Sequence, residues 1–239
     1  MSDRIANRGR GRRRPKQGTL PFRQHGGRRR GAGRKPKGEF AGVRHAKRAK
    51  LAKEFPVHVT VKLVRPLPPL RSKKEYAALR AAFAAGCNRF GFRLVHYAVL
   101  NDHMHFLVEA ADRESLSRGL KGLAVRVARA LNKLWKRRGR VFADRYHDHI
   151  LRSPREVRHA LRYVFANARK HEREGHQVRV TQAIDVFTSG PWFDGWRETI
   201  HVRGLELVAR PITNASTWLL TKGWRRHGLL SVHELPATA

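Results

Sequence analysis

The chain has 239 residues, 41% hydrophobic and 29% charged, and its 52 Lys and Arg against 18 Asp and Glu give a formal net charge of +34. A membrane class is excluded, since no stretch approaches the ~18 to 20 consecutive apolar residues of a membrane helix. So large a positive charge favours nucleic acid as the partner, because binding would release its counterions. We expect a cytoplasmic protein with no secretory signal, and its single cysteine, Cys87, excludes an internal disulfide.

The first part of the chain, residues 1–54, is predicted to be a disordered basic arm rich in Arg and Gly. Residues 1–50 hold 18 Lys and Arg against two acids and few large apolar side chains, so they cannot bury enough surface to offset the entropy of ordering. The segments RGRRRP and GRKPKG resemble arms that enter the minor groove of DNA. A tail that neutralises phosphates without sequence preference is the simpler interpretation.

Hydrophobic periodicity predicts a compact domain over residues 55–173. Apolar residues alternate in PVHVTVKLVR, which indicates a strand, and helical spacing follows Ser72, a plausible N-cap. The best-signalled helix begins at Ser153, which is followed by Pro154 and by Glu156 at the third position. The predicted elements in chain order are a strand at 56–65, a helix at 72–91, strands at 92–100 and 103–110, a helix at 115–139, a short strand before 153, and a helix at 153–171.

The first six elements have the order of a split βαβ sheet. We therefore predict an α/β (α+β) fold of the ferredoxin-like or RRM-like type, with its helices on one face of the sheet. Residues 174–239 contain Trp and Gly but no long periodic element, and we expect them to form an irregular C-terminal extension.

Two histidines lie on alternate positions of the strand at 103–110. Side chains two apart on a strand point to the same face, so His103 and His105 lie side by side while Met104 enters the core. Two imidazoles at this spacing can share one divalent metal ion, although alternate histidines also occur on ordinary half-exposed strands.

The helix at 153–171 offers polar groups for the same site. Tyr163 and Asn167 are one turn apart on one face, and Asn167 could complete the coordination of a metal if that face lies across the strand. A tyrosine beside a metal on a very basic protein suggests nucleophilic attack on a phosphodiester. A half-buried surface tyrosine is the simpler interpretation of Tyr163 alone.

These two motifs together resemble a known family. VLNDHMHFLVE is similar to the histidine-hydrophobic-histidine (HUH) motif of single-tyrosine, IS200-like transposases, and HALRYVFANARKH is similar to their nucleophile helix. The REP-associated tyrosine transposases are the most similar branch, and the resemblance spans residues 56–171. It implies that His103, His105 and Asn167 are metal ligands and that Tyr163 is the nucleophile.

The resemblance also implies an activity. It predicts a DNA transesterase that cleaves and rejoins single-stranded or hairpin DNA through a 5′-phosphotyrosine intermediate, with Mg²⁺ or Mn²⁺, in DNA transposition. It implies a bacterial protein that associates with the nucleoid when bound to DNA, with no membrane partner, and it is compatible with a homodimer. The alternative is a noncatalytic or domesticated protein that binds nucleic acid with the same fold.

One position departs from the family pattern. The family usually has Asn immediately before the first histidine, whereas Asp102 occupies that place here and Asn101 precedes it. Asp102 either forms the turn, which we favour, or adjusts the metal site from behind His103.

Other residues suit DNA contacts. A second alternating pair, His147 and His149, could form another metal site, but a position near the DNA or beneath the sheet is the better interpretation. The tryptophans could stack on unpaired bases, although we expect each to anchor the core: Trp192, Trp196, Trp218 and Trp224. Basic residues that could follow the phosphates cluster late in the helix at 115–139: Arg126, Arg129, Lys133, Lys136, Arg137 and Arg138.

Overall fold

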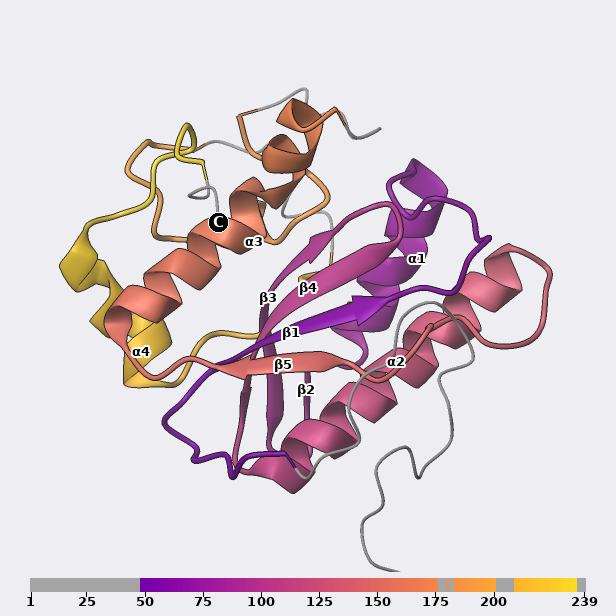
Figure 1. Ribbon diagram of the computed structural model, residues 1–239, viewed down its shortest axis with the longest axis horizontal. Coiled ribbons are helices and arrows are strands. Elements are labelled where there is room, and N and C mark those ends of the chain that lie inside the picture. Colours follow the sequence, from indigo (N-terminus) through magenta and orange to yellow (C-terminus); the bar gives the residue numbers. More distant parts are fainter. Residues whose placement is uncertain (1–47, 176–179, 181–182, 201–208, 236–239) are drawn as a thin grey trace, which may run out of the picture. The chain divides into compact units, whose positions relative to one another are not determined.

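The computed structural model describes residues 48–175, 180, 183–200 and 209–235 (Figure 1). Most of the predicted arm lies outside the described residues. Its last part packs on the domain, because Arg48 pairs with Asp148 at 3.1 Å and Leu51 is buried. The packed part of the chain therefore begins before the expected residue 55.

The described elements alternate between strands and helices in nearly the predicted order. The strands are β1 (Val57–Lys62), β2 (Asn88–Arg89), β3 (Phe92–Val99), β4 (His103–Ala110) and β5 (His147–Ile150). The α-helices are α1 (Lys73–Ala84), α2 (Arg113–Leu134), α3 (Pro154–Arg173) and α4 (Trp218–Thr221). Two short 3-10 helices are η1 (Gly190–Trp192) and η3 (Gly223–His227).

The sheet has the strand order β2-β3-β4-β1-β5, and all neighbouring strands are antiparallel. Strand β4 lies between β1 and β3, which is the split βαβ arrangement that the sequence predicts. The α/β fold class is therefore confirmed. In this register Thr60 of β1 lies directly opposite His105 of β4.

Local capping explains where the helices begin. The Ser72 hydroxyl accepts a hydrogen bond from the Glu75 amide at 3.4 Å, and the Ser153 hydroxyl accepts one from the Glu156 amide at 3.2 Å, as predicted. The predicted start of α2 at residue 115 is wrong by two residues. Asp112 is the N-cap instead, since its carboxylate accepts a hydrogen bond from the Ser115 amide at 2.7 Å.

The predicted helix at 72–91 is wrong at its C-terminal end. α1 stops at Ala84, and the chain then forms β2 and a tight hairpin into β3. Phe90 and Gly91 at the hairpin tip have φ angles of 55° and 72°, which a helix does not contain. Cys87 therefore lies outside α1, as a half-buried free thiol.

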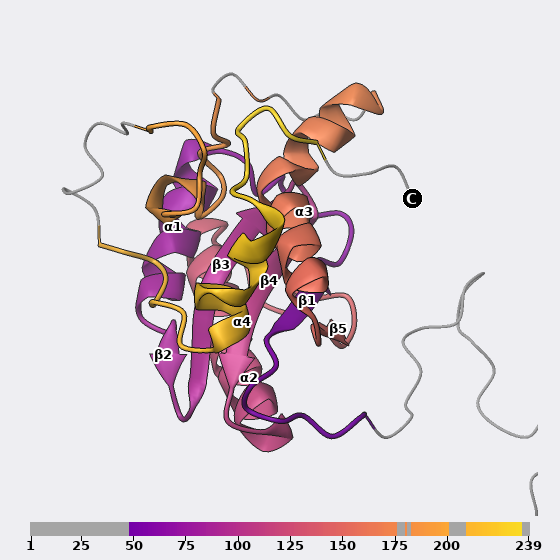
Figure 2. The ribbon, with the colours of Figure 1, turned by 90° about the vertical axis from the view of Figure 1, so that its left-hand side faces the viewer.

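Helices cover both faces of the sheet (Figures 1 and 2). α1 and α2 pack on one face, as expected, but α3 packs on the other, so the prediction of helices on one face alone is incomplete. The first face buries Met104 and Phe106 of β4, and the second buries Leu107. Because side chains alternate along β4, His103 and His105 share the face that α3 covers.

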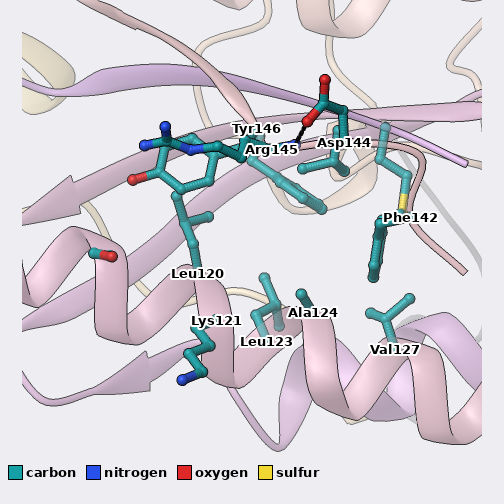
Figure 3. A pocket seen from close by; sticks show the side chains of 13 residues that line it. Leu120, Lys121, Leu123, Ala124, Val127, Phe142, Asp144, Arg145 and Tyr146 are labelled. Carbon is teal, nitrogen blue, oxygen red and sulfur yellow. Dashed lines mark hydrogen bonds between the residues drawn. The ribbon is translucent and has the colours of Figure 1, made fainter. Parts of the chain in front are cut away.

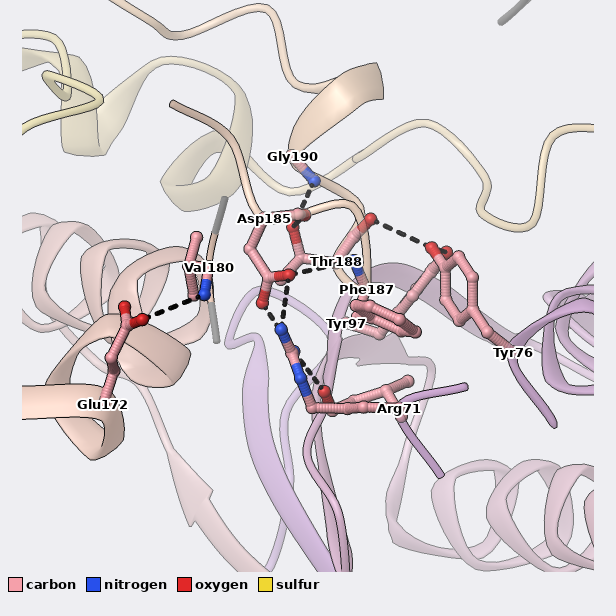
Figure 4. Close-up of polar contacts among 10 residues, drawn as sticks. Arg71, Tyr76, Tyr97, Glu172, Val180, Asp185, Phe187, Thr188 and Gly190 are labelled. Atoms are coloured by element: carbon pink, nitrogen blue, oxygen red, sulfur yellow. Dashed lines mark hydrogen bonds and ion pairs between the residues drawn. The ribbon is translucent and has the colours of Figure 1, made fainter. Parts of the chain in front are cut away.

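The described part of the C-terminal extension contains the short helices η1, α4 and η3, and buried polar contacts attach it to the sheet. The guanidinium of Arg71 donates hydrogen bonds to both carboxylate oxygens of Asp185 at 2.8 and 2.9 Å (Figure 4). In the same region the hydroxyls of Tyr76 and Tyr97 lie 2.8 Å apart. Glu109 of β4, also buried, accepts hydrogen bonds from Ser216 and Thr217. These contacts hold the extension beside β3 and β4.

Candidate active site

The candidate site lies where the first residues of β4 face β1 and the middle of α3. The ring centroids of His103 and His105 are 5.0 Å apart, and the ring of Tyr163 lies 5.1 Å from that of His105. Asn167, one turn after Tyr163, is completely buried. The structure thus brings together the histidines and the helix residues that the sequence singled out.

His105 is held by β1 through one of its ring nitrogens. Its Nδ1 lies 3.1 Å from Oγ1 of Thr60 and 3.2 Å from Nε2 of His58. Its Nε2 is buried and has no hydrogen-bond partner among the described residues. A buried polar atom without a partner costs about 1–3 kcal/mol of folding free energy. A ligand that binds this nitrogen would remove that cost.

His103 is oriented by the residue before it. Its Nδ1–H donates to Oδ1 of Asp102 at 2.7 Å, while Oδ2 of Asp102 accepts a hydrogen bond from Arg65 at 2.6 Å. A proton on Nδ1 leaves Nε2 of His103 with its lone pair. Asp102 therefore does more than form the turn, which was the interpretation we favoured from the sequence. Carboxylates placed in this way behind metal-binding imidazoles are common.

The amide of Asn167 is the most unusual polar group of the site. Both Oδ1 and Nδ2 are buried, and neither makes a hydrogen bond of normal length among the described residues, although the amide is close enough to the Tyr163 hydroxyl to lower its pKa. Metal ions commonly take amide oxygens as ligands. Two imidazole nitrogens and this oxygen fit a divalent ion in chemical type.

The described residues contain no cluster of three or more His, Cys, Asp and Glu side chains that could hold a metal ion. Asn167 is a candidate third ligand of another type, since its side chain is an amide. His171 lies at the edge of the same site, with its ring 5.8 Å from that of His103 and its Nδ1 3.8 Å from Glu174.

Burial controls the protonation of the site. It lowers the pKa of His105 and, with the charge of His149, lowers the pKa of His58 to about 4, so both rings are neutral at pH 7. Burial also raises the pKa of Tyr163, and the charge of Glu174 raises it further. The interaction with the Asn167 amide lowers this pKa but does not cancel the rise. Tyr163 is thus a neutral phenol at pH 7.

The expected DNA-binding residues do not join this site. Arg126, Arg129 and Lys133 lie on α2, and Arg137 and Arg138 follow it, whereas Tyr163 is on α3 across the sheet. The charge near the histidines comes from other residues. Arg65 donates a hydrogen bond to Asp102, and Lys62 of β1 lies opposite His103 in the register of β1 against β4.

His58 and Thr60 are site residues that sequence reasoning missed. They alternate along β1 as His103 and His105 do along β4, and this period of two polar side chains in an apolar strand was the available signal. His149 of the second histidine pair lines a groove of about 390 Å³ with His58 and Tyr163, which agrees with a place near the site rather than beneath the sheet.

A cavity of about 190 Å³ lies on the opposite side of the sheet. Met104, between the two histidines, and Leu120 and Val127 of α2 line it, with Tyr146 at its other wall (Figure 3). Its lining is mainly apolar and lies on the face away from Tyr163, so it adds no group to the candidate site.

The tryptophans divide into two groups. Trp224 is 1% exposed and anchors the core, and the indole N–H of Trp196 donates to the Gly190 carbonyl at 2.9 Å. The expectation of core anchoring is wrong for Trp218, which is 47% exposed although part of its ring packs against Gly223. In the part of the chain that the structure describes, no helix is both long and apolar enough to cross a bilayer.

Comparison with known proteins gives a match to a family model and several similar solved structures. Residues 68–167 match the family model described as "Transposase IS200 like". A REP-associated tyrosine transposase bound to a REP hairpin is similar at 21% identity and a TM-score of 0.46, over 54% of this chain and 74% of that one. A candidate transposase from Deinococcus radiodurans R1 is similar at 14% identity and a TM-score of 0.36, over 55% and 95%. No curated protein matches the chain.

Proposed function

We propose that this protein cleaves and rejoins single-stranded DNA with Tyr163 as the nucleophile, a proposal supported by the match of residues 68–167 to the family model of IS200-like transposases. The observation that carries the proposal is the presence, close to the Tyr163 ring, of buried atoms of His105 and Asn167 that make no hydrogen bond of normal length. Such atoms are costly in a site that serves the fold alone. The protein's charge of +34 supports a phosphate polymer as the substrate.

His103, His105 and Asn167 would hold a divalent ion, Mg²⁺ or Mn²⁺. Bound there, the ion would supply Lewis-acid polarisation of the scissile phosphate. Nε2 of each imidazole would be the ligand atom. Nδ1–H of His103 would then donate a hydrogen bond to Asp102, and Nδ1–H of His105 would donate one to the side chain of Thr60 or His58.

Tyr163 would attack the phosphorus. Its phenolic oxygen forms a new P–O bond as the bond from phosphorus to the 3′ oxygen breaks, which leaves a 5′-phosphotyrosine and a free 3′-OH. The phenolic proton leaves to solvent and the departing 3′ oxygen takes up one proton. The phosphodiester count is unchanged, so attack by a 3′-OH can reverse the step and rejoin DNA.

A noncatalytic nucleic-acid-binding protein is the second candidate. An RNA- or DNA-binding sheet of this type usually presents aromatic rings to bases on its central strands. Here α3 covers the corresponding face, and β4 places His103 and His105 on it. This arrangement favours catalysis over binding by the open face of the sheet. Hairpin DNA is the natural substrate to test, and a homodimer is compatible with the proposal.

The test is formation of a covalent protein–DNA adduct. Full-length protein is incubated with Mn²⁺ or Mg²⁺ and labelled single-stranded oligonucleotides that contain a hairpin, and denaturing gels separate the adduct. We expect an adduct that depends on the metal ion and is lost in Tyr163→Phe. Tyr146→Phe is the matched control, since Tyr146 contacts Arg48 and lies outside the site.

The outcomes separate the two candidates. An adduct that persists in Tyr163→Phe overturns the assignment of the nucleophile. If no adduct forms with any oligonucleotide and metal while hairpin DNA still binds, the noncatalytic candidate replaces the enzyme.

A further inference from the structure

The end of the sheet opposite His103 carries two exposed aromatic side chains. Phe90, at the tip of the β2–β3 hairpin, is 61% exposed, and Trp218, at the start of α4, is 47% exposed. Together with the three arginines beside these rings, we call this surface the aromatic end: Phe90, Trp218, Arg89, Arg118 and Arg226.

The backbone at Phe90 gives no structural reason for an aromatic residue. Its φ of 55° is left-handed, a conformation that Gly, Asn and Asp adopt readily and that costs a bulky side chain free energy. Packing does not offset this cost, because most of the ring is in solvent. Strained backbone and exposed apolar rings both concentrate at functional sites.

Positive charge surrounds both rings. The guanidinium carbons of Arg118 and Arg89 lie 5.1 and 5.4 Å from the centroid of the Phe90 ring. That of Arg226 lies 4.8 Å from the centroid of the Trp218 ring. The arginine side chains are exposed, so they can reach a phosphate while they remain near the rings.

A groove of about 390 Å³ runs from Trp218 to Gly91, the residue after Phe90. Lys53 and Arg93 also line it.

The carboxylate of Glu109 also lines the groove, but it accepts hydrogen bonds from Ser216 and Thr217 and pairs with Arg93 at 3.4 Å. Glu54 is the second carboxylate in the lining, so the lining itself has as many carboxylates as cations. The excess positive charge of this end comes from Arg89, Arg118 and Arg226.

We propose that the aromatic end is a second DNA-binding site, which takes unpaired nucleotides. Bases would stack on Phe90 and Trp218, and the arginines would contact the phosphates. A rise of about 3.3 Å per residue over the eight residues of β4 places this end roughly 23 Å from His103. The inference shares with the proposed function only the premise that the partner is DNA.

The test is fluorescence anisotropy with a labelled single-stranded oligonucleotide of mixed sequence and no divalent metal. Salt is kept at about 0.2 M, so that binding through phosphate contacts alone is weak. Stacking of one base on an aromatic ring predicts that Phe90→Asn weakens binding by about fivefold to a hundredfold, and Trp218→Ala likewise. Asn suits the left-handed backbone, so the thermal midpoint of Phe90→Asn should be unchanged or higher.

The controls isolate stacking from charge and folding. Val186→Asn removes another exposed apolar side chain, 41% exposed, and should leave the affinity unchanged. The hairpin-free duplex of the same sequence should bind wild type and Phe90→Asn equally, because its bases are already stacked. Unchanged single-strand affinity in both variants, or an equal loss for duplex, overturns the proposal. Because the assay contains no metal and needs no cleavage, failure of the adduct experiment leaves this result interpretable.

Discussion

Asp102 binds His103 and Arg65 at once: one carboxylate oxygen lies 2.7 Å from Nδ1 of His103 and the other 2.6 Å from the guanidinium of Arg65. Burial alone would raise the pKa of Asp102, but hydrogen bonds from His103 and Arg65 lower it to about 2. The carboxylate is therefore charged at pH 7. It occupies the position at which the transposases that the sequence resembles usually have Asn. Its oxygen can fix the ring of His103 as an amide oxygen would, and it also carries a full negative charge.

This relationship predicts that Asp102→Ala weakens metal binding. Loss of a hydrogen-bond partner behind a metal-binding imidazole typically lowers affinity by about 10- to 100-fold. Asp102→Asn retains an oxygen acceptor and should recover part of the loss. The measurement is titration of the DNA-free protein with Mn²⁺, followed by electron paramagnetic resonance. Asp194→Asn, at an 85% exposed carboxylate, is the control; equal affinities for Asp102→Ala and wild type would show that Asp102 serves the turn alone.

The pKa of Tyr163 predicts a pH dependence. Burial and the charge of Glu174 raise this pKa, so the reactive phenolate is scarce at pH 7 and becomes more abundant as the pH rises. Adduct formation should thus accelerate between pH 7 and 9. Glu174→Gln removes one raising charge and should shift the profile to lower pH. Glu172→Gln, at an exposed position on the same helix turn, should leave the profile in place; a rate independent of pH in all three proteins would contradict the role of the phenolate.

The candidate site was predictable from the sequence to the extent that local periodicity determines it. A period of two put His103 and His105 on one face, and one helical turn joined Tyr163 to Asn167. His58 and Thr60 were not predictable in this way, since only the register of β1 against β4 places Thr60 opposite His105. The roles of these residues in catalysis and metal binding stay predictions.

In the fold, too, local features were predictable from the sequence and features that depend on long-range packing were not. Capping signals gave the start of α3, but the two-residue strand β2 is too short for a periodic pattern. The face that α3 covers depends on long-range packing with η3 and the extension, which no local pattern contains. For the same reason Trp224 and Trp218 look alike in sequence, yet one is buried and the other exposed.

Gly119 allows α2 to approach β3 closely. A Cβ atom at this position would lie 2.1 to 2.6 Å from carbon atoms of the buried Phe92 side chain. Gly119→Ala should therefore destabilise the protein by about 1–3 kcal/mol, despite the higher helix propensity of Ala. At Gly122 of the same helix the added Cβ meets only the flexible Arg126 side chain, at 3.3 Å, so Gly122→Ala should stabilise by up to about 1 kcal/mol. Urea denaturation of both variants measures the difference, and a Gly119→Ala protein as stable as Gly122→Ala would refute the close approach.

Glu109 is the buried charge through which β4 holds the C-terminal extension. Its two oxygens accept hydrogen bonds from the amides and hydroxyls of Ser216 and Thr217 at 2.7 to 3.0 Å, and Arg93 lies at 3.4 Å. Because these partners donate, Glu109→Gln would place an NH₂ group against N–H donors and leave at least one of them unsatisfied.

We expect Glu109→Gln to reduce the free energy of unfolding by about 2–4 kcal/mol, given that hydrogen bonds to a charged group contribute about 1.5–3 kcal/mol and an unsatisfied donor adds its own cost. The loss should be local at first: in hydrogen exchange, the amides of Ser216 and Thr217 should lose protection before those of β1 and β4. Glu114→Gln is the matched control, since its carboxylate is 80% exposed and lies 3.8 Å from Arg118, and such surface pairs contribute less than about 1 kcal/mol. If both substitutions had the same small effect, the extension would have to be held by the buried pair of Arg71 and Asp185 and by the Trp224 core instead.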